Sequence, residues 1–103
     1  MSGYVLSPAA QDDLVGIRDF YLKEAGYRVA RQMLAEFVQV FRTIAMAPGI
    51  GHKREDLAEG RLVLFFPMRD YLIVYRSSSR PVEIVMIARG SRDIATIIKR
   101  REP

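Results

Sequence analysis

The chain has 103 residues, of which half are apolar and 27% are charged, and this composition is typical of one globular domain. It has no cysteine, which excludes disulfides, thiolate metal ligands and a cysteine nucleophile. No apolar run approaches the ~20 residues of a transmembrane helix, and no signal peptide is visible at the N-terminus. We therefore expect a cytoplasmic protein that does not bind membranes.

The net charge of +4 lies entirely in the second half of the chain, because residues 1–50 carry five basic and five acidic side chains. Arginine outnumbers lysine thirteen to three, and the planar guanidinium suits carboxylates and phosphates better than an ammonium does. This distribution favours an acidic partner, either nucleic acid or an acidic protein segment. Charge alone fits a plain solvated surface equally well.

The first half predicts a short strand followed by two helices. We expect a strand at Tyr4–Leu6, and then a helix that Ser7 caps, with Pro8 in its first turn and an end by Gly26. Its apolar face repeats at helical spacing: Ala10, Leu14, Ile17 and Tyr21.

A second helix is predicted for about Tyr27 to Ala47, where the apolar residues keep the i, i+3, i+4 spacing without a break. The short interruption at Gly26 predicts an antiparallel helix hairpin. Four apolar residues lie off the predicted core faces: Val15, Phe20, Leu22 and Val40. They are either scattered surface residues or part of a groove for a partner.

The second half predicts a loop over residues 48–60, strands at about 61–66, 70–76 and 82–88, and a short helix from Ser91. The short connections between the strands imply antiparallel pairing. The predicted fold is therefore α+β, with the order β-α-α-β-β-β and a C-terminal helix. An N-terminal strand and a helix hairpin pack on a mostly antiparallel sheet, in one domain spanning residues 1–103.

Five arginines lie at or just past the predicted strand ends, and we expect several of them to converge on one edge of the sheet. Converging guanidinium groups hold a phosphate chain or an acidic peptide, so these residues are the candidate target-binding site. The alternative, for any single one of them, is an ordinary solvated charge. The five are Arg61, Arg69, Arg76, Arg89 and Arg92.

The remaining candidates for chemistry have simpler interpretations. His52 is the only histidine, and without a positioned partner a turn residue is favoured over a general base or a metal ligand. The acidic group of Glu55, Asp56 and Glu59 lies among basic neighbours, which favours local charge pairing.

The central strand carries Tyr71, Ile73 and Tyr75 on one face. Such tyrosines either stack on RNA bases or belong to the core, and we prefer the core. The sequence has no glycine-rich phosphate loop, nucleophile elbow or zinc spacing. We therefore expect no metal and no cofactor, and no hydrolase, kinase or dehydrogenase of a common type.

Four segments, in this order and spacing, make the chain resemble the RelE/ParE superfamily of toxins from type II toxin–antitoxin systems, closest to the ParE branch. They are residues 6–14, residues 48–52, residues 66–76 and residues 87–93. The resemblance covers nearly the whole chain. It implies a small toxin that is neutralised by a cognate, ParD-like antitoxin in a hetero-oligomer, in a system of the plasmid-stabilisation type. The predicted antitoxin contacts are the four off-face apolar residues named above.

The resemblance also implies a choice of target, because RelE-like members cleave messenger RNA on the ribosome and ParE-like members inhibit DNA gyrase. RelE-like nucleases have an arginine where this chain has Leu72 and a tyrosine where it has Ile98, whereas Arg92 matches one of their arginines. The strand at 61–66 also offers no lysine. These departures favour inhibition of gyrase by binding, without catalysis.

Two alternatives remain open at this point. One is a ribosome-dependent endoribonuclease with a rearranged site that uses Arg61, Arg92 and either His52 or Tyr71. The other is a chain that has kept the fold and antitoxin binding but lost its toxicity.

Overall fold

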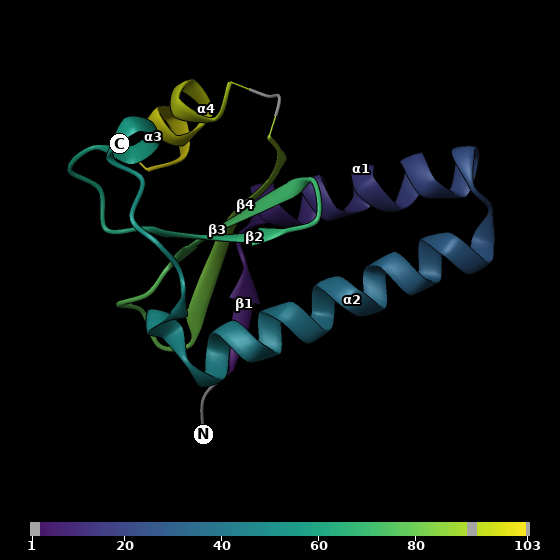
Figure 1. The fold of residues 1–103 in the computed structure, drawn as a ribbon, viewed down its shortest axis with the longest axis horizontal. Helices are drawn as coiled ribbons and strands as arrows, with labels where there is room; N and C mark the ends of the chain where they lie inside the picture. Colours follow the sequence, from purple (N-terminus) through teal and green to yellow (C-terminus); the bar gives the residue numbers. More distant parts are fainter. Residues whose placement is uncertain (1–2, 91–92, 103) are drawn as a thin grey trace.

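The computed structural model describes residues 3–90 and 93–102, which form a four-stranded sheet with helices on both faces (Figure 1). The sheet has the order β1-β4-β3-β2, in which β1 runs parallel to β4 and the other neighbours are antiparallel. This confirms the predicted α+β class. The elements are β1 (Tyr4–Leu6), α1 (Pro8–Glu24), α2 (Tyr27–Met46), a 3-10 turn η1 (Pro48–Ile50), α3 (Glu55–Ala58), β2 (Leu64–Met68), β3 (Tyr71–Arg76), β4 (Val82–Arg89) and α4 (Ile94–Arg101).

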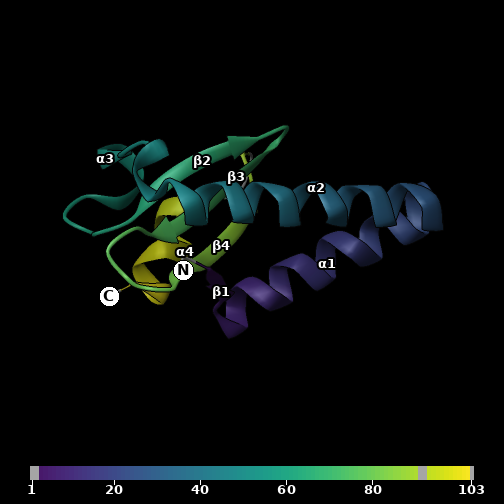
Figure 2. The same cartoon turned by 90° about the horizontal axis from the view of Figure 1, so that it is seen from below.

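The hairpin of α1 and α2 covers one face of the sheet, and its tip projects beyond the strands (Figures 1 and 2). Ser7 caps α1 by accepting a hydrogen bond from the Ala10 amide, as predicted. Gly26 joins the helices with a φ of 89°, a conformation that glycine adopts readily. Phe37 and Phe41 of α2 are fully buried against this face of the sheet.

The opposite face is covered by the short helices α3 and α4, so the molecule has three layers (Figure 2). Ile94 and Ile98 of α4 are buried there, as expected. The segment before α4 includes Ser91, which lies outside the described residues, and the helix itself begins at Ile94. Asp93 caps it by accepting from the amide and hydroxyl of Thr96.

A β-bulge in β4 decides which of its side chains reach each helix layer. Val74 pairs with Met86 and Tyr75 with Ile84, so Val85 is an extra residue on β4. Ile84 and Ile87 therefore both contact the hairpin side, although they are three residues apart. Val85 and Met86 both lie on the side of α4.

Two expectations for residues 48–66 are wrong. The segment expected to be a loop contains η1 and α3, and β2 begins at Leu64 instead of residue 61. The strand continues through Pro67, which lacks an amide donor and is tolerated because β2 is an edge strand. Arg61 consequently lies before the strand, in the connection from α3.

Buried Tyr75 fastens the beginning of this segment to the sheet. Its hydroxyl donates to the Pro48 carbonyl at 2.6 Å and accepts from the Gly51 amide at 2.9 Å. His52 then pairs with Phe65 through two backbone hydrogen bonds of 2.8 Å.

Candidate partner-binding site

The described strand-end arginines lie at two opposite ends of β3, so the expectation that they converge on one edge is wrong. Arg61 and Arg76 lie near the end of β3, whereas Arg69 and Arg89 lie near its beginning at Tyr71. The cause is the antiparallel order, in which consecutive strand ends alternate between the two sides of the sheet. Arg92 lies outside the described residues.

Arg61 and Arg76 are held by Glu102, the residue that follows α4. Arg76 contacts the Glu102 carboxylate and also lies 3.8 Å from Glu83. Arg61 donates to the Glu102 backbone oxygen at 2.6 Å. These two cations therefore tie the end of α4 to the sheet, and much of their hydrogen-bonding capacity is already used.

Arg69 is also paired, although it is exposed. Its guanidinium makes two hydrogen bonds of 2.8 Å to the Glu36 carboxylate on α2. These hydrogen bonds from Arg69 are the main cause of a lowered pKa of Glu36. The turn before β3 places Arg69 at a φ of 53°, which is unusual for a residue with a side chain.

Arg89 differs from these three because, among the described residues, no carboxylate lies within ion-pair distance of it. Its guanidinium carbon lies 5.0 Å from the centre of the Phe20 ring and 5.5 Å from that of Tyr71. Both distances fall within the range of cation–π attraction. The rings hold the charge in place, and the contact with the Tyr71 hydroxyl raises the pKa of Arg89.

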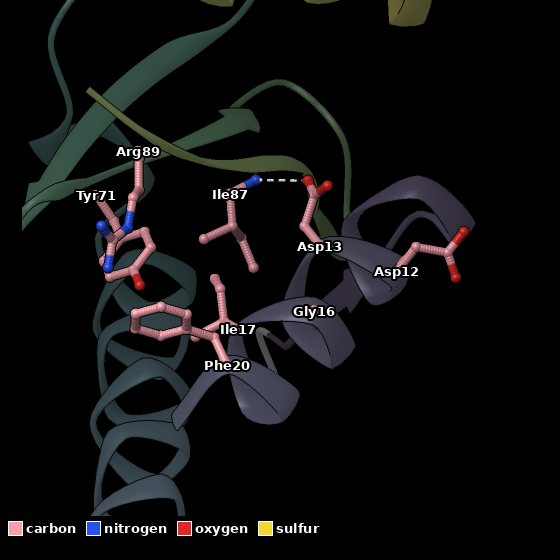
Figure 3. Close-up of a pocket in the computed structure, with 8 residues that line it drawn as sticks. All are labelled: Asp12, Asp13, Gly16, Ile17, Phe20, Tyr71, Ile87 and Arg89. Carbon is pink, nitrogen blue, oxygen red and sulfur yellow. Dashed lines mark hydrogen bonds between the residues drawn. The ribbon is translucent and has the colours of Figure 1, made fainter. Parts of the chain in front are cut away.

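Arg89 and Phe20 line a pocket of about 470 Å³ between α1 and the end of β4 (Figure 3). We call it the Arg89 groove. Arg89 lies at one end, Asp12 points away at the other, and the apolar side chains lie between them. Its lining residues are Asp12, Asp13, Gly16, Ile17, Phe20, Tyr71, Ile87 and Arg89.

Asp13 and Arg101 complete the edge of β4 next to this groove. β1 pairs with β4 only over Val82–Ile84, so the strand has no neighbour beyond that point on this side. The Asp13 carboxylate accepts from the Ile87 amide at 2.9 Å and forms an ion pair of 2.7 Å with Arg101. Arg101 also donates to the Val85 carbonyl at 3.1 Å. Two side chains thus occupy positions that a further strand would take.

Tyr71 lies at the base of the groove and is almost fully buried. Burial raises its pKa, and its hydrogen bond to the Tyr21 hydroxyl at 3.4 Å raises the pKa further. Tyr71 therefore remains a neutral phenol at ordinary pH. Tyr71, Ile73 and Tyr75 all contact the helix hairpin, which confirms that they share one face and belong to the core.

The remaining candidates show no arrangement for catalysis in the part of the chain that the structure describes. His52 is exposed and takes part in the backbone bridge to Phe65. Asp56 pairs with Arg54 at 2.8 Å, in keeping with local charge pairing. No group of three potential metal ligands occurs among the described residues. Within the same residues, no helix combines the length and apolar character needed to cross a bilayer.

The four predicted antitoxin contacts fall in different places. Phe20 is 44% exposed and lines the Arg89 groove, and Val15 lines a smaller pocket of about 270 Å³ beside Leu34. Leu22 is exposed near the hairpin tip. Val40 is half-buried and packs against the core, so little of it is available to a partner.

Sequence reasoning missed three residues of this region. They are Asp13, Gly16 and Arg101, none of which the sequence marks as part of a site. At Gly16 a Cβ atom would meet nothing within 4 Å, so this residue leaves open space in the Arg89 groove. An acidic residue in α1 and an arginine 88 positions later give no local signal of their pairing.

Two residues bear on the comparison with RelE-like nucleases that the resemblance implies: Ile98, which belongs to α4, and Leu72 of β3, which packs against the same apolar cluster. Ile98 is 1% exposed in the apolar cluster under this helix, and Leu72 is half-buried against the same cluster. These positions therefore contribute to packing and offer neither a cation nor a proton donor.

The fold is similar to that of a solved structure described as the chromosomal ParDE TA system from P. aeruginosa. The TM-score is 0.71 over 86% of this chain and 96% of that chain, at 20% identity, and the likeness shows the fold. No curated protein was found to match the sequence. Residues 4–94 match the family described as the ParE toxin of the type II toxin-antitoxin system, parDE, and the chain belongs to this family.

Proposed function

We propose that this ParE-family protein acts in the cytoplasm as a toxin that inhibits DNA gyrase by binding, and that a cognate antitoxin neutralises it. The proposal extends the family assignment to a target and a mode of action. Its main support is the apolar character of Leu72 and Ile98, which pack in the core where a RelE-like nuclease has catalytic side chains.

Catalysis of RNA cleavage needs a group that activates the 2′-hydroxyl and cations that stabilise the charged phosphorane. The described part of the chain offers no such set. Tyr71 is buried and its pKa is raised, His52 is remote from the Arg89 groove on the β2 side, and Arg61 is engaged by Glu102. Binding to a partner does not require any of these side chains to gain or lose a proton. The arrangement of these residues therefore favours inhibition by binding over cleavage of RNA.

The test is a supercoiling assay with purified gyrase and the purified chain. We expect the chain to inhibit supercoiling or to trap cleaved DNA, and we expect the antitoxin encoded beside its gene to relieve the effect. A translation extract serves as the parallel assay, in which messenger RNA should stay intact. Unimpaired supercoiling at excess toxin, together with RNA cleavage that is lost on Arg92→Ala, would instead establish the endoribonuclease.

A further inference from the structure

The tip of the helix hairpin extends past the strands and takes no part in the core (Figures 1 and 2). We define the hairpin tip as residues 22–29, which are all exposed except Gly26. Ile17 is the last buried residue of α1 before the tip, and Ala30 is the first of α2 after it. Packing of the core therefore does not explain which side chains the tip carries.

Three large apolar side chains lie on this short segment. Tyr27 is 70% exposed, Leu22 42% and Val29 37%. One exposed apolar residue is ordinary, but three among eight consecutive residues on a projecting element form a surface that gains from being covered. Tyrosine is also enriched in the centres of protein–protein interfaces.

The charges of the tip and of the next turn of α2 are mainly positive. Lys23, Arg28 and Arg31 are exposed and form no ion pair among the described residues, and Glu24 is the one carboxylate in this stretch. Arg28 lies in the first turn of α2, which has neither an acidic residue nor a side-chain cap. The helix dipole makes a cation unfavourable there, so Arg28 does not serve the stability of the helix.

The turn at the tip is short and internally bonded. The amides of Ala25 and Gly26 both donate to the Tyr21 carbonyl at 2.9 Å, and Gly26 alone links the last turn of α1 to α2. The side chains on either side of this link are therefore held in place before a partner arrives. Such preorganisation reduces the entropy lost on binding.

We propose that the hairpin tip is the surface that contacts gyrase, and that it enters an acidic recess of that protein. This inference rests on the inhibition of gyrase proposed above. Tyr27 lies at the centre of the contact, and Arg28 and Arg31 pair with carboxylates around it, because a guanidinium offers two parallel donors to a carboxylate. A projecting element with a narrow end suits a recess better than a flat surface.

The composition of the tip favours protein over DNA as the surface that it contacts. The phosphate backbone is recognised mainly through its charge, so the three apolar side chains would contribute little to it. Glu24 would also be repelled by phosphates, whereas it can pair with a basic residue of a protein. An acidic protein surface with apolar residues in it satisfies both kinds of side chain.

The first test reverses a charge and measures the toxin concentration that half-inhibits supercoiling by purified gyrase. We expect Arg28→Glu to raise this concentration roughly tenfold or more, as for an interface arginine. Arg42→Glu makes the same change at an exposed position nearer the other end of α2, and should alter it by less than about twofold. Arg28→Glu should also raise the temperature of thermal unfolding, because an acidic residue suits the first turn of a helix. A variant that is more stable but inhibits less has lost a contact and not its fold.

The second test removes an apolar side chain at each end of α2. Tyr27→Ser should weaken inhibition roughly tenfold or more, whereas Met46→Ser, at a residue that is 81% exposed, should have little effect. Surface plasmon resonance with DNA-free gyrase should show the same order of affinities as the supercoiling assay.

Three results would overturn the inference. The first is inhibition like that of the wild type in both Arg28→Glu and Tyr27→Ser. The second is weaker binding to bare duplex DNA with unchanged binding to DNA-free gyrase, which would assign the tip to DNA. The third is weaker binding to the antitoxin encoded beside the gene with inhibition intact, which would assign it to the antitoxin. A wild-type chain that leaves gyrase fully active contradicts the proposed function itself, and the inference falls with it.

Discussion

Gly51 lies against the buried Tyr75 ring, and no side chain larger than hydrogen fits there. A Cβ atom at this position would lie 2.6 Å from the Tyr75 hydroxyl oxygen and 3.0 Å from the Leu64 Cβ atom. We expect Gly51→Ala to lower the free energy of unfolding by about 1–3 kcal/mol, as overpacking does. Gly49→Ala is the matched control, because a Cβ atom there meets nothing within 4 Å. Urea unfolding measures both, and equal midpoints for the two variants would contradict the packing described.

The pairing of Arg69 with Glu36 predicts a titration that NMR can follow. The hydrogen bond from Arg69 lowers the pKa of Glu36 below its ordinary value of 4.5. A carboxylate with a lowered pKa stabilises the fold above that ordinary value, and the contribution disappears as the pH falls through the lowered pKa. We expect Arg69→Gln to return the pKa of Glu36 toward 4.5. A wild-type value at or above 4.5 would show that the pair does not form in solution.

At the scale of elements, Asp13 joins α1, β4 and α4 through one carboxylate. Asp13→Ala leaves the Ile87 amide and the Arg101 guanidinium without their acceptor. We expect it to cost roughly 2–3 kcal/mol of unfolding free energy, less than the ~3–5 kcal/mol of a fully buried pair because a quarter of Arg101 stays exposed.

The neighbouring Asp12→Ala is the control for this measurement. Asp12 is exposed and makes no ion pair among the described residues, so its loss should cost no more than about 1 kcal/mol through the helix dipole. Thermal or urea unfolding compares the two variants. If Asp13→Ala were no more destabilising than Asp12→Ala, the proposed connection of α4 to α1 would not exist.

How much of this architecture the sequence predicts depends on whether a feature is local. Three features follow from the spacing of residues in the sequence, and each is found as predicted. They are the buried apolar face of α2, the Ser7 cap of α1, and the shared face of Tyr71 and Tyr75. The bulge at Val85 and the contact of Arg101 with Asp13 depend on how segments distant in the sequence pack together. The spacing of residues along the chain therefore does not predict them. The arginines are separated because β2, β3 and β4 run antiparallel, so that consecutive strand ends lie on opposite sides of the sheet.

At the scale of the whole molecule, the basic residues of the second half do not form one continuous binding edge. Arg61 and Arg76 secure the C-terminal helix, Arg69 secures the turn before β3 to α2, and Arg89 is directed into a groove beside α1. The Arg89 groove thus lies where the hairpin meets the end of β4, and among the described residues no carboxylate lies within ion-pair distance of its guanidinium. This arrangement suits recognition of another macromolecule, and we propose that the protein acts by recognition without catalysis.

The dose dependence of gyrase inhibition tests that claim most directly. An inhibitor that acts by binding reduces supercoiling in proportion to the fraction of gyrase occupied, and its effect reaches a plateau once the enzyme is saturated. We predict this behaviour for the purified chain, with added messenger RNA and ribosomes left intact. Uninhibited gyrase at saturating toxin, with RNA degraded by toxin at amounts far below those of the ribosome, would contradict it.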